Sequence, residues 1–335
     1  GTMEVTCGEG GMLAEGSGEN GWELENLVLD AADVVPEGSE LYRMKTLLEP
    51  ASDGSLVRLV NRAGPPLSLD LASLLVADHV EGVSAWCTGD RVVTGVAHPV
   101  YRVATTAEEV VTSTFEVSAN APAFTRGDTL EVWFRESGEP DGLLLETIGR
   151  SQSTVRDSSG VLIQIPSSRG GWTTVAHHHP RQYFDECLID SLSSARARLV
   201  FLSDVGLRRI AWVAREGVAS VQRLSLLHAA HSRTDAVTSA VASDDRTTTT
   251  LEPGDTLSLS YEVPGLERGK VREWFLSVRA LSPTVRDALR SGANQSETAP
   301  RPVRVALLQN QPNPFSGTTT IRFELPRAAK VRLDV

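Results

Sequence analysis

The sequence predicts a mainly β protein, with two homologous antiparallel β-sandwich domains in tandem and a short third module after them. Short apolar stretches in which every second side chain is polar recur along the chain, and clusters of Gly, Pro, Ser and Asp separate them. Alternation with a period of two is typical of strands that bury one face. Many short strands between turn residues favour antiparallel sandwiches.

The clearest single strand follows the turn at residues 253–255, where Leu257, Leu259 and Tyr261 alternate with polar residues. The same pattern predicts strands at residues 56–60, 113–117, 130–134, 161–165, 197–202, 210–213 and 221–226. The apolar stretches 67–80 and 283–290 fit either strands or short helices, because periodicity alone does not decide runs of this size.

Part of the pattern occurs twice, which predicts a duplicated fold. The segment 126–134 resembles 253–261, with Gly127 matching Gly254, and residues 154–157 recur at 284–287. Residues 74–86 also resemble 199–212, which would place Trp86 and Trp212 at matching positions. We therefore expect one sandwich at residues 20–158 and a second at 159–288. Residues 1–19 would be a flexible N-terminal segment, 289–305 a linker, and 306–335 the third module.

Composition limits the classes of partner. The net charge of −11 argues against nucleic acid as a partner, since phosphate binding needs clustered Lys and Arg. No apolar run reaches the length that crosses a bilayer, so we expect no membrane span. Cys7, Cys87 and Cys187 are too few and too far apart for a disulfide framework or a Cys-x-x-Cys metal site, although one bridge between two of them is possible.

Three consecutive histidines are the strongest candidate for chemistry. On a strand, His177 and His179 would share a face with Cα atoms about 6.6 Å apart, and Asp185 or Glu186 could supply a third metal ligand. The alternative is that they are solvated residues before Pro180. The sequence contains no Gly-x-Ser-x-Gly, His-Glu-x-x-His or phosphate-loop motif, so we predict no catalytic residue and no cofactor.

Two further motifs have alternative interpretations. Residues 126–128 spell Arg-Gly-Asp, but the matching 253–255 is Pro-Gly-Asp, which favours a turn that opens a strand over a cell-adhesion signal. Most of the six tryptophans are expected in cores, Trp133 among them. Trp22 and Trp172 follow glycines and are candidates for exposure, where an indole could stack on a sugar.

The C-terminal residues carry the one specific resemblance. A strand is expected at 318–325, after a stiff proline-containing segment. The segment before it contains Gln309, Asn310, Pro312, Asn313, Pro314 and Phe315. This run resembles the start of the type IX secretion C-terminal sorting domain and of the Ig-like domain of the flagellar hook-capping protein. The resemblance covers residues 306–335 and stops before the module's later strands, so we expect a truncated Ig-like module.

The resemblance implies export to the cell surface or the medium, with the type IX secretion machinery as partner. Residues 271–276 are also similar to repeat regions of large exported bacterial proteins. We therefore interpret the chain as a non-catalytic β-sandwich segment of a larger exported protein, acting as a spacer, stalk or binding module for a surface glycan or protein. Two alternatives stay open: an accessory carbohydrate-binding region of an exported hydrolase, and a metal-dependent enzyme centred on His177 and His179.

Overall fold

The computed structural model divides the chain into one compact unit, Gly1–Pro283, and a second, Thr284–Val335. It describes residues 12–19, 21–28, 40–45, 47–61, 66–89, 91–105, 109–110, 122–134, 141–149, 159–181, 185–190, 192, 194–215, 220–243, 247–281, 306–307 and 323–324. In the second unit, β24 (Ala306–Leu307) pairs antiparallel with β25 (Phe323–Glu324). The predicted linker and most of the predicted third module lie outside these residues.

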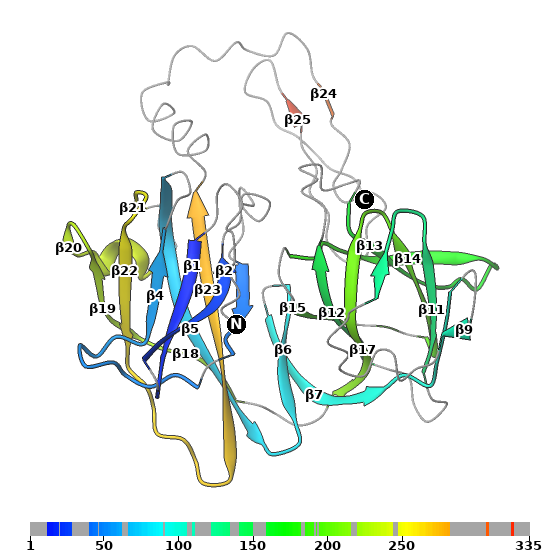
Figure 1. The fold of residues 1–335 in the computed structure, drawn as a ribbon, viewed down its shortest axis with the longest axis horizontal. Helices are drawn as coiled ribbons and strands as arrows, with labels where there is room; N and C mark the ends of the chain where they lie inside the picture. The colour runs from blue at the N-terminus through cyan, green and yellow to red at the C-terminus, as the bar shows by residue number, and fades with distance from the viewer. Residues whose placement is uncertain are drawn as a thin grey trace. The chain divides into compact units, whose positions relative to one another are not determined.

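The first unit confirms the predicted mainly β class. Antiparallel strands make up its sheets, and α1 (Thr238–Val241) is the one helix among the described residues (Figure 1). In the part of the chain that the structure describes, no helix has the length and apolarity needed to cross a bilayer.

Sandwich 1 consists of two sheets, which we name A and B. Sheet A has the order β2 (Gly21–Val28), β1 (Met12–Gly18), β4 (Val57–Val60), β22 (Thr256–Tyr261), β19 (Leu226–His231) and β20 (Asp235–Ala236). Sheet B has the order β18 (Ser220–Arg223), β5 (Leu67–Val80), β23 (Lys270–Leu281) and β3 (Glu40–Arg43), and β21 (Thr249–Leu251) also pairs with β5. One cluster of buried apolar side chains, which includes Leu59, Leu69 and Leu276, fills the space between them.

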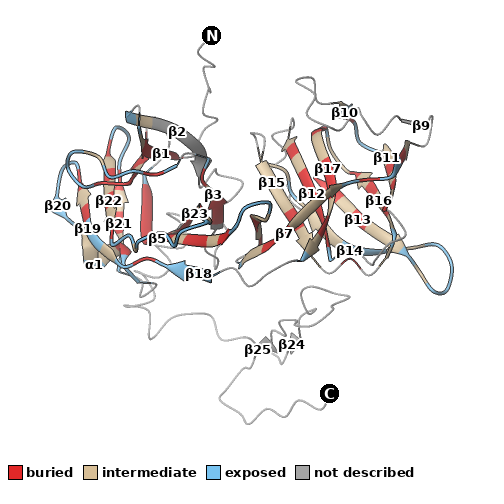
Figure 2. Cartoon of the chain, turned by 90° about the horizontal axis from the view of Figure 1, so that it is seen from below, coloured by how far each residue is buried: buried red, intermediate tan, exposed pale blue. Residues whose placement is uncertain are grey.

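Sandwich 2 consists of sheets C and D. Sheet C has the order β15 (Asp185–Asp190), β12 (Gly142–Gly149), β17 (Val205–Arg215), β7 (Arg91–Pro99) and β6 (Ser84–Thr88), with β10 (Ala123–Phe124) also on β17. Sheet D has the order β14 (Trp172–His178), β13 (Val161–Pro166), β16 (Arg196–Phe201), β11 (Thr129–Trp133), β8 (Arg102–Thr105) and β9 (Glu109–Val110). A second buried cluster, which includes Leu130, Leu143 and Leu199, lies between these sheets. Buried residues are red in Figure 2 and run along the strands of both sandwiches.

Sandwich 2 is inserted into sandwich 1. Sandwich 1 takes its strands from residues 12–80 and 220–281, whereas sandwich 2 is built from residues 84–215. The predicted division at residues 158–159 is therefore wrong. Strands from the first predicted domain, β4 and β5, pair with β22 and β23 from the second, and β11 pairs with β16 across the same predicted boundary.

The duplication itself is visible in the strand order. Sheets A and D align strand for strand, so β1, β4, β22 and β19 correspond to β13, β16, β11 and β8. The registers agree as well, since Leu257 pairs with Leu59 as Leu130 pairs with Leu199. A β-bulge follows Ala14 in the first hairpin and the equivalent residue, Ile163, in the second. Each sandwich thus combines the first half of one copy with the second half of the other.

The duplicated Gly-Asp turn has the same geometry in both sandwiches. Gly127 and Gly254 have φ values of 96° and 89°, a region that favours glycine. The Asp128 carboxylate accepts a hydrogen bond of 2.7 Å from the Thr125 amide, and Asp255 accepts one of 2.9 Å from the Glu252 amide. The Arg-Gly-Asp sequence therefore forms a turn that opens a strand, as its repeated partner predicts.

One predicted repeat match is wrong. The strand register aligns residues 57–60 with 197–200, so Arg58 and Leu59 correspond to Arg198 and Leu199. Residues 74–86 are not the counterpart of 199–212. Trp86 lies in β6 and Trp212 in β17, two strands of the same sheet that do not correspond to each other.

Residues 67–80 form a strand, β5, and the alternative of a short helix is wrong. Its side chains are buried almost continuously because both faces are covered. Leu69, Leu74 and Val76 pack in the cluster between sheets A and B, whereas Ala77 joins Ala85 of sandwich 2 in a separate buried cluster. A strand buried on both faces has no period-two pattern, which explains the ambiguity of the sequence.

The prediction of a flexible segment at residues 1–19 is wrong for its described part. Residues 12–18 form β1, which pairs with β2 and β4. Met12, Leu13 and Ala14 are buried in sandwich 1. Glycine and glutamate dominate the composition of this segment, but three consecutive apolar residues provide enough core contact to order it.

The exchange of halves predicts which fragments fold. We expect residues 84–215 to fold alone, because they contain every strand of sandwich 2. We expect residues 159–283 to stay unfolded, since β22 and β23 would lack their neighbours β4 and β5. Urea unfolding followed by circular dichroism checks this, and a cooperative transition only in the fragment 159–283 would contradict the assigned strand order.

Candidate functional site at the junction of the sandwiches

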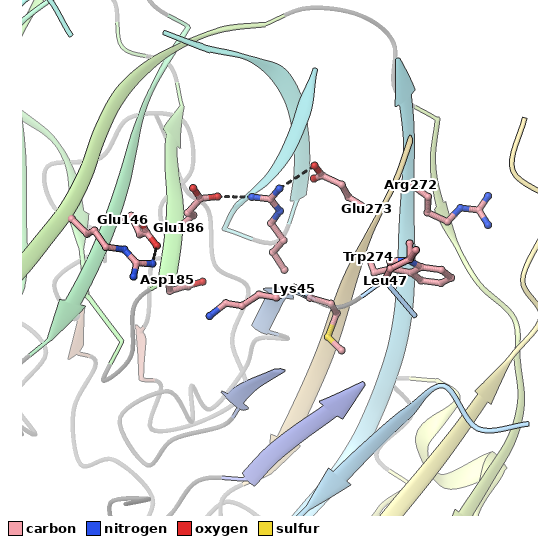
Figure 3. A pocket seen from close by; sticks show the side chains of 11 residues that line it. Lys45, Leu47, Glu146, Asp185, Glu186, Arg272, Glu273 and Trp274 are labelled. Carbon is pink, nitrogen blue, oxygen red and sulfur yellow. Dashed lines mark hydrogen bonds and ion pairs between the residues drawn. The ribbon is translucent and has the colours of Figure 1, made fainter. Parts of the chain in front are cut away.

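A pocket of about 540 Å³ lies where strands of both sandwiches meet. Its lining combines charged and apolar side chains from β3, β12, β15, β17, β23 and the residues that follow β3 (Figure 3). The cationic residues are Arg43, Lys45, Arg208 and Arg272, the acidic ones are Glu146, Asp185, Glu186 and Glu273, and Met44, Leu47 and Trp274 are apolar. The cationic and acidic side chains of the lining are equal in number.

Arg43 connects the two sandwiches. Its Nη1 donates to Glu186 on β15 of sandwich 2, and its Nη2 donates to Glu273 on β23 of sandwich 1 at 3.0 Å (Figure 3). The other oxygen of Glu273 accepts a 2.9 Å hydrogen bond from the amide of Ala85 on β6. Arg209 donates to the second oxygen of Glu186 at 2.8 Å. One guanidinium thus lies between two carboxylates, each of which has a further donor.

Arg181 makes a second connection. It donates to Asp185 at 2.8 Å and to the carbonyl oxygen of Leu41 in β3 at 3.2 Å. Its guanidinium carbon lies 4.1 Å from the centre of the Tyr42 ring, a cation–π geometry. Burial raises the pKa of Asp185, and the nearby Arg181 opposes that rise.

The remaining acidic residue of the pocket is also paired. Arg208 donates to Glu146, and this hydrogen bond raises the pKa of the Arg208 guanidinium. Arg272 makes a two-bond contact to Asp78 with distances of 2.7 and 2.6 Å. Each of these carboxylates is thus engaged by an arginine. The arrangement is therefore suited to joining two sandwiches.

The histidine candidates lie on the β13–β14 hairpin and just beyond it. The centres of the His177 and His179 rings lie 4.1 Å apart, although His179 lies beyond the end of β14. The Nε2 of His177 donates to the Ser159 carbonyl oxygen at 2.7 Å, which occupies one potential ligand nitrogen. Asp185 is paired with Arg181. Among the described ranges, no group of three His, Cys, Asp or Glu side chains is arranged to hold a metal ion.

His178, between these two, is the histidine with the clearest electrostatic perturbation. Its Nε2 lies 2.8 Å from the Thr147 hydroxyl oxygen. Burial lowers the pKa of His178 to about 3, and positive charge on His179 and Arg181 adds to the effect. His178 is therefore neutral at physiological pH.

The described cysteines are not bridged. Cys87 and Cys187 both carry free thiols. Burial raises the pKa of the Cys187 thiol to about 12, which keeps it protonated and unreactive. Cys7 lies outside the described residues.

Trp22 and Trp172 occupy equivalent positions in the two sandwiches. Trp22 pairs with Ser17, and Trp172 pairs with Pro166. Ser17 and Pro166 each lie three residues after the residue that the bulge follows, Ala14 or Ile163. The guanidinium carbon of Arg58 lies 3.8 Å from the Trp22 ring centre, and that of Arg198, the equivalent residue, lies 4.5 Å from the Trp172 ring centre. Both indoles are only partly exposed, because an arginine lies against each.

Sequence reasoning placed Trp133 in a core, and the structure places it on the outer face of sheet D. Leu130 and Val132 point into sandwich 2, so the next residue, Trp133, points the other way. The guanidinium carbons of Arg102 and Arg196 each lie 5.0 Å from its ring centre. The parity of the strand was the signal that could have identified this position.

The predicted sorting motif lies outside the described residues. Its members are Gln309, Asn310, Pro312, Asn313, Pro314 and Phe315.

Similarity to known proteins is low. No family model matches the chain, and no curated protein matches it at a significant level. Among solved structures, a rhamnosidase from Novosphingobium sp. PP1Y is similar with a TM-score of 0.27 and 11% identity. The match covers 83% of this chain and 24% of the rhamnosidase, so the chain spans about a quarter of that protein's length. A similarity this low supports no argument about function.

Removal of the Arg43 side chain tests the junction. We expect Arg43→Met to lower the free energy of unfolding by about 1.5–3 kcal/mol, because Glu186 and Glu273 would each lose a charged donor while largely shielded from water. The control is Arg91→Met, since the exposed Arg91–Asp190 pair should contribute less than about 1 kcal/mol. Equal losses in urea unfolding of the two variants would contradict the assigned role of Arg43.

The lowered pKa of His178 predicts that the folded protein loses stability in acid. Its pKa is about 3 in the folded protein and 6.5 in the unfolded chain, so below pH 6.5 protons bind the unfolded state preferentially. Stability should fall with pH between 6.5 and about 3, by about 1.4 kcal/mol per pH unit from this group. In urea unfolding at pH 7 and 5, His178→Gln should reduce this loss, whereas the control His228→Gln, an exposed position on β19 of sandwich 1, should not. Identical pH dependence in wild type and His178→Gln would show that His178 does not titrate as described.

Proposed function

We propose that the chain is a non-catalytic β-sandwich segment of a larger exported bacterial protein, in which sandwich 1 is a spacer and sandwich 2 is a binding module that it presents. The observation that carries this proposal is the insertion. Sandwich 2 leaves sandwich 1 after β5 and returns at β18, so both of its connections attach to the same domain. The first and last strands of the two sandwiches, β1 and β23, therefore both belong to sandwich 1, which suits it to act as the spacer.

The junction supports the same reading. Arg43 on β3 forms an ion pair with Glu186 of sandwich 2, and Arg181 of sandwich 2 donates to the Leu41 carbonyl oxygen of β3. A buried cluster of Leu41, Ala77, Ala85 and Phe275 lies beside them. The acidic side chains of the pocket are engaged in pairs with arginines, which favours a structural role over proton transfer in a reaction.

Export is the second part of the proposal and rests on the C-terminal sequence. The motif at residues 309–315 resembles the start of a type IX sorting domain, whose complete form would engage the secretion machinery. The protein would then act at the outer cell surface or in the medium. A spacer that presents a second domain is consistent with that location.

Surface labelling tests the proposed location. Antibodies raised against residues 12–281 should label intact cells of the source bacterium, because the segment would be outside the outer membrane. Cells that lack the type IX secretion machinery should lose the label and keep the protein inside. Labelling only after permeabilisation would contradict the proposal, and an antibody against a cytoplasmic protein controls for cell integrity.

A further inference from the structure

The outer face of sheet D carries a stack of alternating indoles and guanidiniums. Its five members, the tryptophan–arginine stack, are Arg102, Trp133, Arg196, Trp172 and Arg198. The guanidinium carbon of Arg196 lies 5.0 Å from the Trp133 ring centre and 4.9 Å from that of Trp172, so it touches both indoles. Arg102 approaches Trp133 from the opposite neighbouring strand.

The order of strands in sheet D fixes this stack. β8 and β16 flank β11, so their arginines lie on either side of Trp133. β8 and β16 are about 9.6 Å apart, which is twice the spacing of neighbouring strands. Trp172 on β14 reaches over β13 to the two arginines of β16. The arginines are therefore held in a row by the indoles, which reduces the entropy lost when they bind a ligand.

The face is positively charged within an acidic chain. Arg196 pairs with Glu131, but Arg198 bonds to the neutral amide oxygen of Gln164 at 2.9 and 2.6 Å, so this partner leaves its charge uncompensated. The Arg196 side chain is 41% exposed and Arg102 is exposed, although the net charge of the chain is −11. The outer face of sheet D thus carries positive charge, whereas the chain as a whole is negative, and a positive face suits an anionic ligand.

Sandwich 1 provides an internal comparison. It retains only the pair of Trp22 and Arg58, and the positions equivalent to Trp133, Arg102 and Arg196 hold Ser260, His228 and the buried Leu56. The pair is thus common to both copies, whereas the longer stack belongs to sandwich 2. A stack needed only for folding of the sandwich would be expected in both copies.

We propose that the outer face of sheet D binds an acidic polysaccharide, a chain of uronic acid sugars. Guanidiniums bind carboxylates through two parallel hydrogen bonds, and the partly exposed indoles offer apolar contact to sugar C–H groups. The exposed Thr174 hydroxyl, which lies beside Gln164, adds a polar group suited to sugar hydroxyls. A nucleic acid is the other polyanion that such a face would attract, and the binding test separates the two.

This inference rests on sandwich 2 being the presented binding module. Among the described residues, the junction contacts with sandwich 1 come from Glu186 on β15 and Ala85 on β6 of sheet C and from Arg181 in the connection between β14 and β15. No strand residue of the stack takes part in these contacts. Sheet D is the other layer of sandwich 2. The binding face and the attachment to sandwich 1 therefore lie on different sheets.

Binding to polygalacturonate tests the inference. We expect the full chain to be retarded in gels that contain polygalacturonate, but not in gels that contain neutral dextran, and we expect added NaCl to weaken the retardation. Arg196→Ala and Trp172→Ala should each weaken binding by about tenfold, as expected for central residues of an interface. Arg196→Lys, which keeps the charge but loses the planar group, should also weaken it.

The matched controls are Trp22→Ala and Arg58→Ala in sandwich 1, which should bind as the wild type does. Circular dichroism establishes that every variant is folded. No retardation of the wild type would overturn the inference, as would equal loss in the sandwich 1 variants or equal binding of single-stranded DNA through Arg196. A chain that is exported but does not bind overturns only this inference, whereas one that binds but stays inside the cell overturns only the proposed export.

Discussion

The structure depends on backbone pairing between segments that are far apart in the chain. β4 and β5 lie in the N-terminal third, and their partners β22 and β23 come about 200 residues later. The long ladder between β5 and β23 carries most of sheet B, and its side chains fill the core on one face and contact sandwich 2 on the other. Without this pairing neither the core of sandwich 1 nor the junction at Arg43 would form.

The duplication explains why the exchanged pairing is possible. The strands of sheets A and D correspond in order and share the bulge of their first hairpin, so a strand from either copy fits the same place in these sheets. Residues 81–83 connect β5 to β6, which lies in a different sheet.

The sequence predicted the β class, most strands and the Gly-Asp turns, because these depend on neighbours along the chain. It misplaced the domain boundary, since internal similarity identifies corresponding strands but does not say which strands pair. It also missed the junction. Arg43, Glu186 and Glu273 are ordinary charged residues in the sequence, and their proximity arises only from the fold. Trp22 and Trp172 were singled out as candidates for exposure, but their arginine partners lie on other strands and could not be identified.

The insertion has a mechanical consequence. Met12 in β1 and Leu281 in β23 both belong to sandwich 1, so a pull applied at these two ends stretches that domain and reaches sandwich 2 only through its two connections, side by side on sandwich 1. Under the proposed export, shear would extend sandwich 1 while sandwich 2 stays folded. Sandwich 2 would then keep its proposed ligand bound under load, because the extension takes place in sandwich 1.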